Sequence, residues 1–297
     1  MRAEAKTSPR LARTVAARPV RRAGWLAGIL KQRLALTGAL IVAFFALVAI
    51  VGPRVAPYGP TQQHAQSRLQ PPSSVHWLGT DEFGRDIFSR LLYGAGISFQ
   101  VGVIAVGISG ALGVLLGLIS GYRGGWLDGA LTLLMDVLFA FPAILLAIAI
   151  TAMLGSSLVN VMLAIGIVNT PTFMRVVRGS VLAVRRTAYV EAASALGAST
   201  PRILALHVFP NITAPLIVHA SLNFAFAVLA EASLAFLGLG NKPPSPSWGS
   251  MLSSSYGFLE LAPWAALFPG LAIALTVLGF NLLGDGLRDA LDPRLRT

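Results

Sequence analysis

Two carboxylates, Asp136 and Glu231, lie inside long apolar stretches of the sequence, where an ionisable group is costly. Such a group can bind a transported solute or proton, or it can pair with a neighbour and orient helix packing. His219 is a third intramembrane polar candidate, with solute binding or a hydrogen bond between helices as its two uses. Two carboxylates are fewer than a proton relay displays, which favours the packing role for Asp136 and Glu231.

Catalytic chemistry needs residue patterns that this sequence lacks. A phosphate-binding loop ends in Gly-Lys-Ser/Thr, but the residues before the three lysines are Ala5, Leu30 and Asn241. The four histidines show no His-Glu-x-x-His spacing, and there is no cysteine. We therefore expect no catalytic site, no metal site and no cofactor on this chain, so that any energy must come from an ion gradient or another protein.

The composition places the chain in a membrane. Hydrophobic residues make up 55% of it and charged residues only 12%, which excludes an ordinary soluble domain. The net charge of +11 does not indicate nucleic acid, because the basic residues are spread over short loops and an N-terminal tail.

Uncharged stretches long enough to cross a bilayer predict an all-α membrane protein with six transmembrane helices. They lie near residues 34–53, 97–121, 129–153, 158–175, 211–233 and 262–284. The third and fourth form a hairpin, because Gly155-Ser156-Ser157 interrupts an apolar run that is too long for one span. The second carries Gly113, Gly117 and Gly121, whose spacing favours close packing against another helix.

The distribution of Lys and Arg predicts the orientation. Eighteen of the 23 lie in the segments that share a side with the two termini, so we expect both termini in the cytoplasm. Residues 1–33 form a basic tail that we expect to be disordered. It either rests on anionic lipid headgroups or serves only as a topology signal.

The longest cytoplasmic connection, residues 176–209, has the signals of two short helices. Thr187 and Gly197 are positioned to cap the first. Ser199-Thr200 and Pro201 begin the second, which we expect Pro210 to end.

One face of the first short helix is small and mostly apolar. By three- and four-residue spacing it carries Tyr189, Ala192, Ala193 and Leu196. Because this face has no core of its own domain to cover it, we expect it to bind a groove on a partner protein. The alternative, a helix lying on lipid, is weakened because residues 188–201 hold neither Lys nor Arg.

This segment resembles the EAA motif of the six-span permeases of binding-protein-dependent ABC importers. The matching residues are Glu191-Ala192-Ala193, Gly197 and Pro210, while His207 and Phe209 replace the usual Ile and Leu. The resemblance implies a coupling helix that inserts into a separate ATPase, with Glu191 fixing the contact and the small residues permitting close approach.

Four further stretches resemble the C-type permease of peptide importers. They are His76 through Arg90; Asp136 with Phe141-Pro142; Phe236 through Gly249; and Asn281 through Arg294. Two positions depart from that pattern, Gly96 and Leu133, where relatives have arginine. The local partner expected for Asp136 is therefore absent.

The first of these stretches also suggests a folded turn. Gly79 and Gly84 permit a tight chain path, and acidic and basic residues alternate along it. The charged residues are Asp81, Arg85, Asp86 and Arg90. The turn, like the Pro- and Ser-rich loop 241–261, either contacts a binding protein outside the membrane or only caps the bundle.

The resemblance implies a bacterial inner-membrane permease subunit that forms half of the path for peptides or a related small solute. Its expected partners are a homologous second permease, two ATPase subunits that bind ATP and Mg²⁺, an extracytoplasmic substrate-binding protein and membrane lipid. Residues 34–96 would hold the first span and an outer segment, and 97–297 the core permease domain. The competing hypothesis is a gradient-driven transporter or channel that titrates through Asp136 or Glu231.

Overall fold

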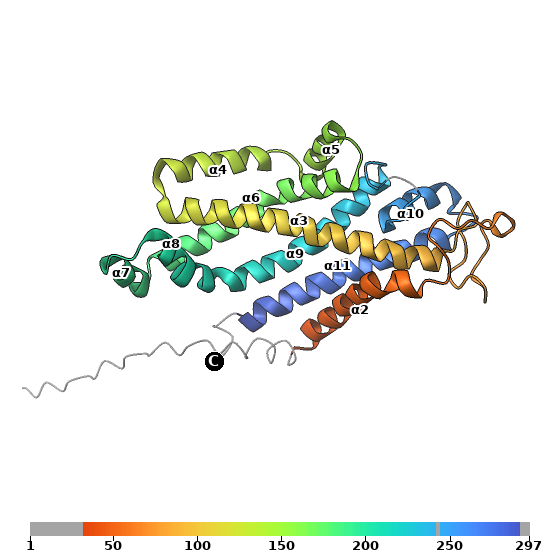
Figure 1. The fold of residues 1–297 in the computed structure, drawn as a ribbon, viewed down its shortest axis with the longest axis horizontal. Helices are drawn as coiled ribbons and strands as arrows, with labels where there is room; N and C mark the ends of the chain where they lie inside the picture. The colour runs from red at the N-terminus through yellow and green to blue at the C-terminus, as the bar shows by residue number, and fades with distance from the viewer. Residues whose placement is uncertain (1–31, 242–243, 292–297) are drawn as a thin grey trace, which may run out of the picture.

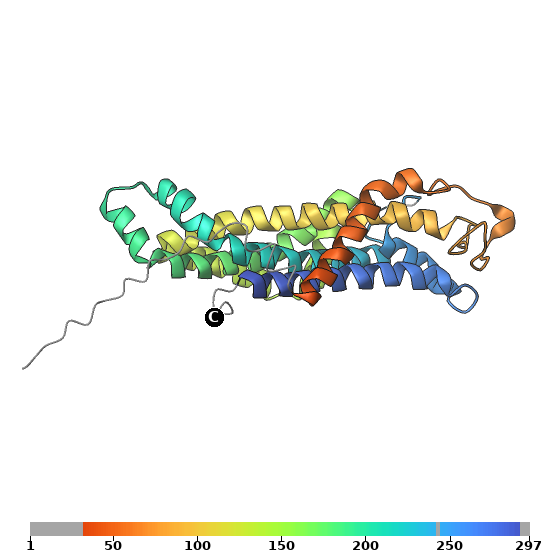
Figure 2. The same ribbon diagram turned by 90° about the horizontal axis from the view of Figure 1, so that it is seen from below.

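The computed structural model describes residues 32–241 and 244–291, which are helical with no β-strand (Figure 1). The long helices are α2 (Arg33–Val55), α3 (Ile87–Arg123), α4 (Gly125–Phe139), α5 (Ala143–Leu154), α6 (Leu158–Arg185), α9 (Phe209–Phe236) and α11 (Trp264–Leu291). The short helices are α7 (Ala188–Ala195), α8 (Thr200–Ile203) and α10 (Trp248–Ser255). The long helices run side by side; α7 and α8 lie at one end of the bundle, and α10 and the segment before α3 lie at the other (Figures 1 and 2).

Among the described residues, five helices are long and apolar enough to cross a membrane, and there are six spans if the bent pair α4–α5 is counted as one. The expected all-α membrane fold is confirmed. The straight helix predicted over 129–153 is wrong, because α4 and α5 meet at an angle of 89°. Pro142 explains the break: it has no N–H to donate, and its ring disfavours helical backbone at the preceding residue.

The predicted hairpin between the third and fourth spans is confirmed. Gly155 takes the positive φ of 91° at the end of α5. Ser157 then caps α6, its hydroxyl accepting from the backbone N–H of Asn160 at 3.2 Å. The end of α5 and the capped start of α6 are thus joined by only three residues, 155–157.

Close packing between α3 and α6 also follows the prediction. A Cβ added at Gly113, Gly117 or Gly121 would lie 2.3, 2.6 or 2.9 Å from a Cβ of α6, closer than carbon atoms can approach. The missing side chains let the two backbones meet along three helical turns.

Four helix boundaries differ from the predictions. Helix α3 begins at Ile87, ten residues earlier than expected, because Asp86 caps it, so the proposed division at 96/97 falls inside a helix. Helix α6 continues to Arg185, which shortens the cytoplasmic connection from the predicted 176–209. Helix α11 likewise runs beyond residue 284 to Leu291, and α10 lies inside the loop predicted over 241–261. Most of the basic tail 1–33, with Lys242 and the last motif's Asp292 to Arg294, lies outside the described residues.

Candidate coupling surface, outer ion network and intramembrane polar residues

Helix α7 ends as its sequence predicts. Gly197 follows it with φ +80°. The N–H of Gly197 donates to the carbonyl of Ser194, and the N–H of Ala198 donates to that of Ala193. These two bonds form a Schellman motif, which needs a left-handed residue where glycine stands. Thr187 is the N-cap, but its hydroxyl donates to the Val184 carbonyl at 2.6 Å and caps no N–H of α7.

The outer face of α7 is open. Leu196 is 88% exposed and Tyr189 is 46% exposed, and Ala192 and Glu191 are also exposed. Figure 2 shows that the chain around α7 and α8, in green to teal, stands off the end of the bundle. An exposed apolar face on a projecting helix is a surface suited to a partner groove.

One residue of the predicted face points elsewhere. Ala193 is half-buried and packs with Val190, which is 2% exposed, against Val177 and Val181 of α6. Val190 anchors α7 to the bundle and was missed by the sequence reasoning. Its signal was the three-residue spacing from Val190 to Ala193, which marks an inner strip of the helix next to the strip that carries Tyr189 and Leu196.

The prediction that Pro210 ends the second short helix is wrong. Residues Thr200–Phe236 form one continuous helix, and Pro210 lies in the first turn of α9. The chain passes through a π-helical stretch at Leu204–Val208 just before it. We attribute the wide π turn to the proline, because it relieves the clash that a proline ring makes with the carbonyl one turn earlier.

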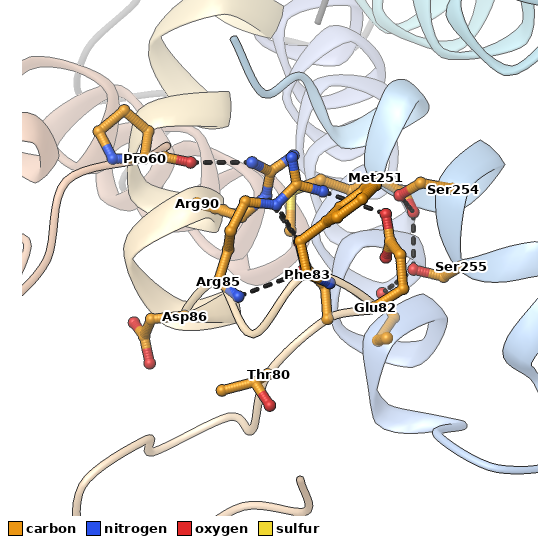
Figure 3. Close-up of polar contacts among 12 residues, drawn as sticks. Pro60, Thr80, Glu82, Phe83, Arg85, Asp86, Arg90, Met251, Ser254 and Ser255 are labelled. Atoms are coloured by element: carbon orange, nitrogen blue, oxygen red, sulfur yellow. Dashed lines mark hydrogen bonds and ion pairs between the residues drawn. The ribbon is translucent and has the colours of Figure 1, made fainter. Parts of the chain in front are cut away.

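An ion network lies at the end of the bundle opposite α7 (Figure 3). Arg85 donates from Nε to Asp81 Oδ2 at 2.6 Å and from Nη2 to Glu82 Oε1 at 3.1 Å. Arg90 lies 3.5 Å from the same Asp81 oxygen and donates to the Pro60 carbonyl at 2.8 Å. These four charged side chains are between 4% and 7% exposed. The charge-paired turn predicted from the sequence is confirmed.

Glu82, which sequence reasoning left out of the turn, is the least well compensated member of this network. Burial, followed by the nearby Asp81 charge, raises the pKa of the Glu82 carboxyl, against the attraction of Arg85 and Arg90. Its Oε2 atom has no hydrogen-bond partner among the described residues. Arg85 is therefore the residue that offsets the cost of burying the Glu82 charge.

The neighbouring Asp86 organises the start of α3. Its Oδ2 atom accepts from the backbone N–H of Ser89 at 2.8 Å and from the Ser89 hydroxyl at 2.7 Å. Its Oδ1 atom lies 2.9 Å from Nδ1 of His76. The loop and the helix are thereby tied together through one carboxylate.

Asp136 has a partner that the sequence did not indicate. Arg175, from α6, donates to its Oδ1 at 3.1 Å, and the guanidinium lies 4.3 Å from the centre of the Phe139 ring. A basic residue on another helix thus replaces the arginine absent at Leu133. Both side chains of the pair are more than half exposed.

Glu231 is completely buried within α9. Ser98 Oγ donates to its Oε2 at 3.4 Å, and Ser247, the N-cap of α10, also interacts with it. Its Oε1 has no partner in the described part of the chain. The carboxyl group therefore lies where α3, α9 and α10 meet, and the structure does not bring it together with Asp136.

His219 interacts within its own helix. Nδ2 of Asn223 lies 2.9 Å from its Nε2 and also donates to its carbonyl at 2.9 Å. The Phe173 ring of α6 packs against the imidazole edge with centroids 4.6 Å apart. Among the described residues, the helix-to-helix hydrogen bond considered for His219 does not occur; its contact with α6 is aromatic.

Known proteins are similar in sequence over most of the chain. Residues 113–297 match the family of the binding-protein-dependent transport system inner membrane component, and residues 26–72 match the N-terminal transmembrane domain of oligopeptide transport permease C. A dipeptide transport system permease protein of Alkalihalophilus pseudofirmus is 51% identical over 90% of this chain and 88% of its own length.

The chain belongs to the family of the binding-protein-dependent transport system inner membrane component.

Two other relatives in the family are glutathione transport system permease proteins. That of Pectobacterium atrosepticum is 45% identical over 90% of this chain and 89% of its own length, and that of Escherichia coli is 47% identical over 90% and 88%. The chain is a multi-pass permease subunit of a binding-protein-dependent importer of the inner membrane. The EAA resemblance and the C-type stretches predicted this family.

A further ion pair of the permease was not predicted. Arg178 of α6 donates to both carboxylate oxygens of Asp128 in α4, at 2.6 and 2.7 Å, and the Ser120 hydroxyl of α3 donates to the same carboxylate. The pair ties α4 to the α3–α6 seam. Its partners are 50 residues apart, so only the charge of each residue was visible in the sequence.

Proposed function

We propose that this permease forms half of an ATP-driven path for peptides or a related small solute, and that α7 and α8 couple it to a separate ATPase. The peptide assignment is supported by relatives named for dipeptide and glutathione transport. A homologous second permease, two ATPase subunits holding ATP and Mg²⁺, and an extracytoplasmic binding protein would complete the importer. Both termini would lie in the cytoplasm, as the Lys and Arg distribution predicts.

The observation that carries the coupling proposal is the projecting α7. Its apolar residues Tyr189 and Leu196 have no core to cover them, while Val190 holds the helix on α6. A force on α7 would therefore reach the bundle rather than bend a loose loop. Glu191 lies in the first turn of α7 and would fix the contact, with Ala192 and Gly197 allowing close approach.

A gradient-driven transporter receives less support from the same residues. Asp136 is paired with Arg175, and Glu231 is enclosed without access to solvent. Neither lies in a chain of titratable groups among the described residues, which a proton relay requires. We therefore propose that a separate protein, and not this chain, supplies the energy for transport.

The test replaces Glu191 and Gly197 with alanine and reconstitutes the complete importer in proteoliposomes. We expect ATP-dependent peptide uptake to fall at least about tenfold, since a dislodged docking helix loses contact energy of the order of 1.4 kcal/mol or more, while the complex still assembles. Hydrolysis by the ATPase subunits should become independent of peptide.

The control pair is Glu260→Ala with Gly238→Ala. Glu260 is exposed on an outer loop, and Gly238 follows α9 with φ +79° and the same two cap hydrogen bonds as Gly197. The control should lose no more than about twofold, because its backbone strain is comparable and its position differs. Full uptake by the Glu191/Gly197 variant would refute the coupling site, and uptake that follows a proton gradient without ATP would refute the ATP-driven importer.

A further inference from the structure

The elbow between α4 and α5 leaves backbone groups without partners inside a span. The N–H groups of Ala143, Ile144 and Leu145 donate to no acceptor in the described chain. The N-cap residue is Pro142, which has no side-chain acceptor. Hydrocarbon cannot satisfy such groups, so irregular backbone at membrane depth belongs beside protein or a water-filled cavity.

A cavity of about 300 Å³ lies beside this elbow. It is an open cavity bounded by the elbow, α6 and α9, and Ala143, the first residue of α5, is part of its wall. Phe139, Phe141 and Phe226 give it aromatic sides, while Asn169, Thr172, His219 and Asn223 give it polar groups. Aromatic walls with a few polar groups are typical of binding sites for small solutes.

The environment of Asn169 differs from that of a polar residue in ordinary helix packing. The residue is only 5% exposed, yet its side-chain amide makes no hydrogen bond with any described residue. Asn160 and Asn223 differ, because the amide of each donates to nearby carbonyls. An amide that lines a cavity without a protein partner is free to bond to whatever occupies that cavity.

We infer that this cavity is a binding site on the translocation path, and that its ligand is a carbonyl or carboxylate group of the transported peptide. The unpaired N–H of Ala143, which lines the cavity, and the positive end of the α5 dipole attract such an oxygen. The Asn169 amide can donate to the same group and accept from a peptide N–H. Broken helices that turn an N-terminus toward an anionic solute group occur in other transporters. The inference rests on the proposed function.

Replacing Asn169 with leucine removes the amide at similar volume. We expect peptide uptake by the reconstituted importer to fall about tenfold at limiting peptide, because one hydrogen bond to the solute is lost. The matched control is Thr276→Val, since Thr276 is also fully buried with an unpartnered hydroxyl but lies in α11, away from this cavity.

A second measurement does not depend on the leucine variant folding. The chain has no cysteine, so Thr172→Cys places a single thiol on the cavity wall and Ser233→Cys places one on another groove of α9. A saturating dipeptide should slow labelling of the Thr172→Cys importer by a small aqueous thiol reagent at least about fivefold. Labelling of the Ser233→Cys importer should be unaffected by the same dipeptide.

The outcomes separate the two proposals. If the unaltered importer does not take up peptide with ATP, the proposed function fails. If it does, but the Asn169 variant transports as well as the Thr276 control and the dipeptide does not protect the thiol of the Thr172→Cys variant, only the binding site is refuted.

Discussion

Arg85 compensates two buried carboxylates at the end of the bundle opposite α7, whereas Arg90 reaches only Asp81. The network can persist in a buried place because its two positive and two negative groups lie within direct contact. Removing one member exposes the desolvation cost that the pairing offsets.

We predict that Arg85→Ala destabilises the assembled protein by about 3–5 kcal/mol, the usual cost of leaving buried charge without its partner. Exposed Arg54, which donates to the Ile50 carbonyl at the end of α2, provides the control, and Arg54→Ala should cost no more than about 0.5 kcal/mol. Thermal unfolding of the detergent-solubilised importer measures both.

The loss of stability caused by Arg85→Ala should depend on pH. The pKa of Glu82 is raised above its ordinary value of 4.5, so the stability linked to its protonation is present below about 4.5 and is lost as pH rises through the folded pKa. Without Arg85 that pKa rises further, and the deficit of Arg85→Ala should shrink as the pH falls from about 7.5 to about 5. A deficit that grows on acidification would contradict this assignment.

Among the helices, the α3–α6 seam is the contact most sensitive to side-chain size. Gly117→Ala would place a Cβ 2.6 Å from that of Val177 and 2.8 Å from the Met174 carbonyl. We predict a loss of about 1–3 kcal/mol, since neither helix can withdraw without opening the seam.

Gly107 offers a control on the same helix. It is exposed, and a Cβ there would meet nothing within 4 Å, so Gly107→Ala should be neutral or stabilise by up to about 1 kcal/mol through helix propensity. Thermal unfolding of the two variants under identical conditions compares them. Equal melting temperatures would show that the seam adapts to an extra methyl group.

The sequence was informative for helices wherever apolar runs and cap residues coincided. The hairpin at Gly155 and the end of α7 at Gly197 are local events that a few residues determine. Hydropathy failed at Arg175, which was taken as the end of a span although a partner on another helix pairs with it inside α6. It also missed the elbow at Pro142, because an uncharged run gives no sign of a bend.

The candidate sites show the same division between local and distant contacts. The exposed face of α7 follows from helical spacing, whereas its anchor Val190 depends on α6. The turn from Asp81 to Arg90 follows from a short stretch of sequence. The Asp136–Arg175 pair spans 39 residues, and only the packed helices bring its members together.

For the whole molecule, the predicted orientation can be tested with single cysteines in a chain that has none. Trp77 is 61% exposed at the outer end, and Leu196 is 88% exposed at the opposite end. In intact cells stripped of their outer membrane, an impermeant thiol reagent should label the Trp77→Cys variant and should label the Leu196→Cys variant only after lysis. The reverse pattern would place both termini outside.

The continuous helix from Thr200 to Phe236 has a mechanical consequence. Its longest part, the 28 residues of α9, is about 42 Å long, with α8 at one end and Glu231 near the other. A tilt of about 5° around the end next to α8 would carry the far end about 4 Å, close to the pitch of one helical turn. A lever of this length turns a small displacement at one surface of the bilayer into a solute-sized displacement at the other.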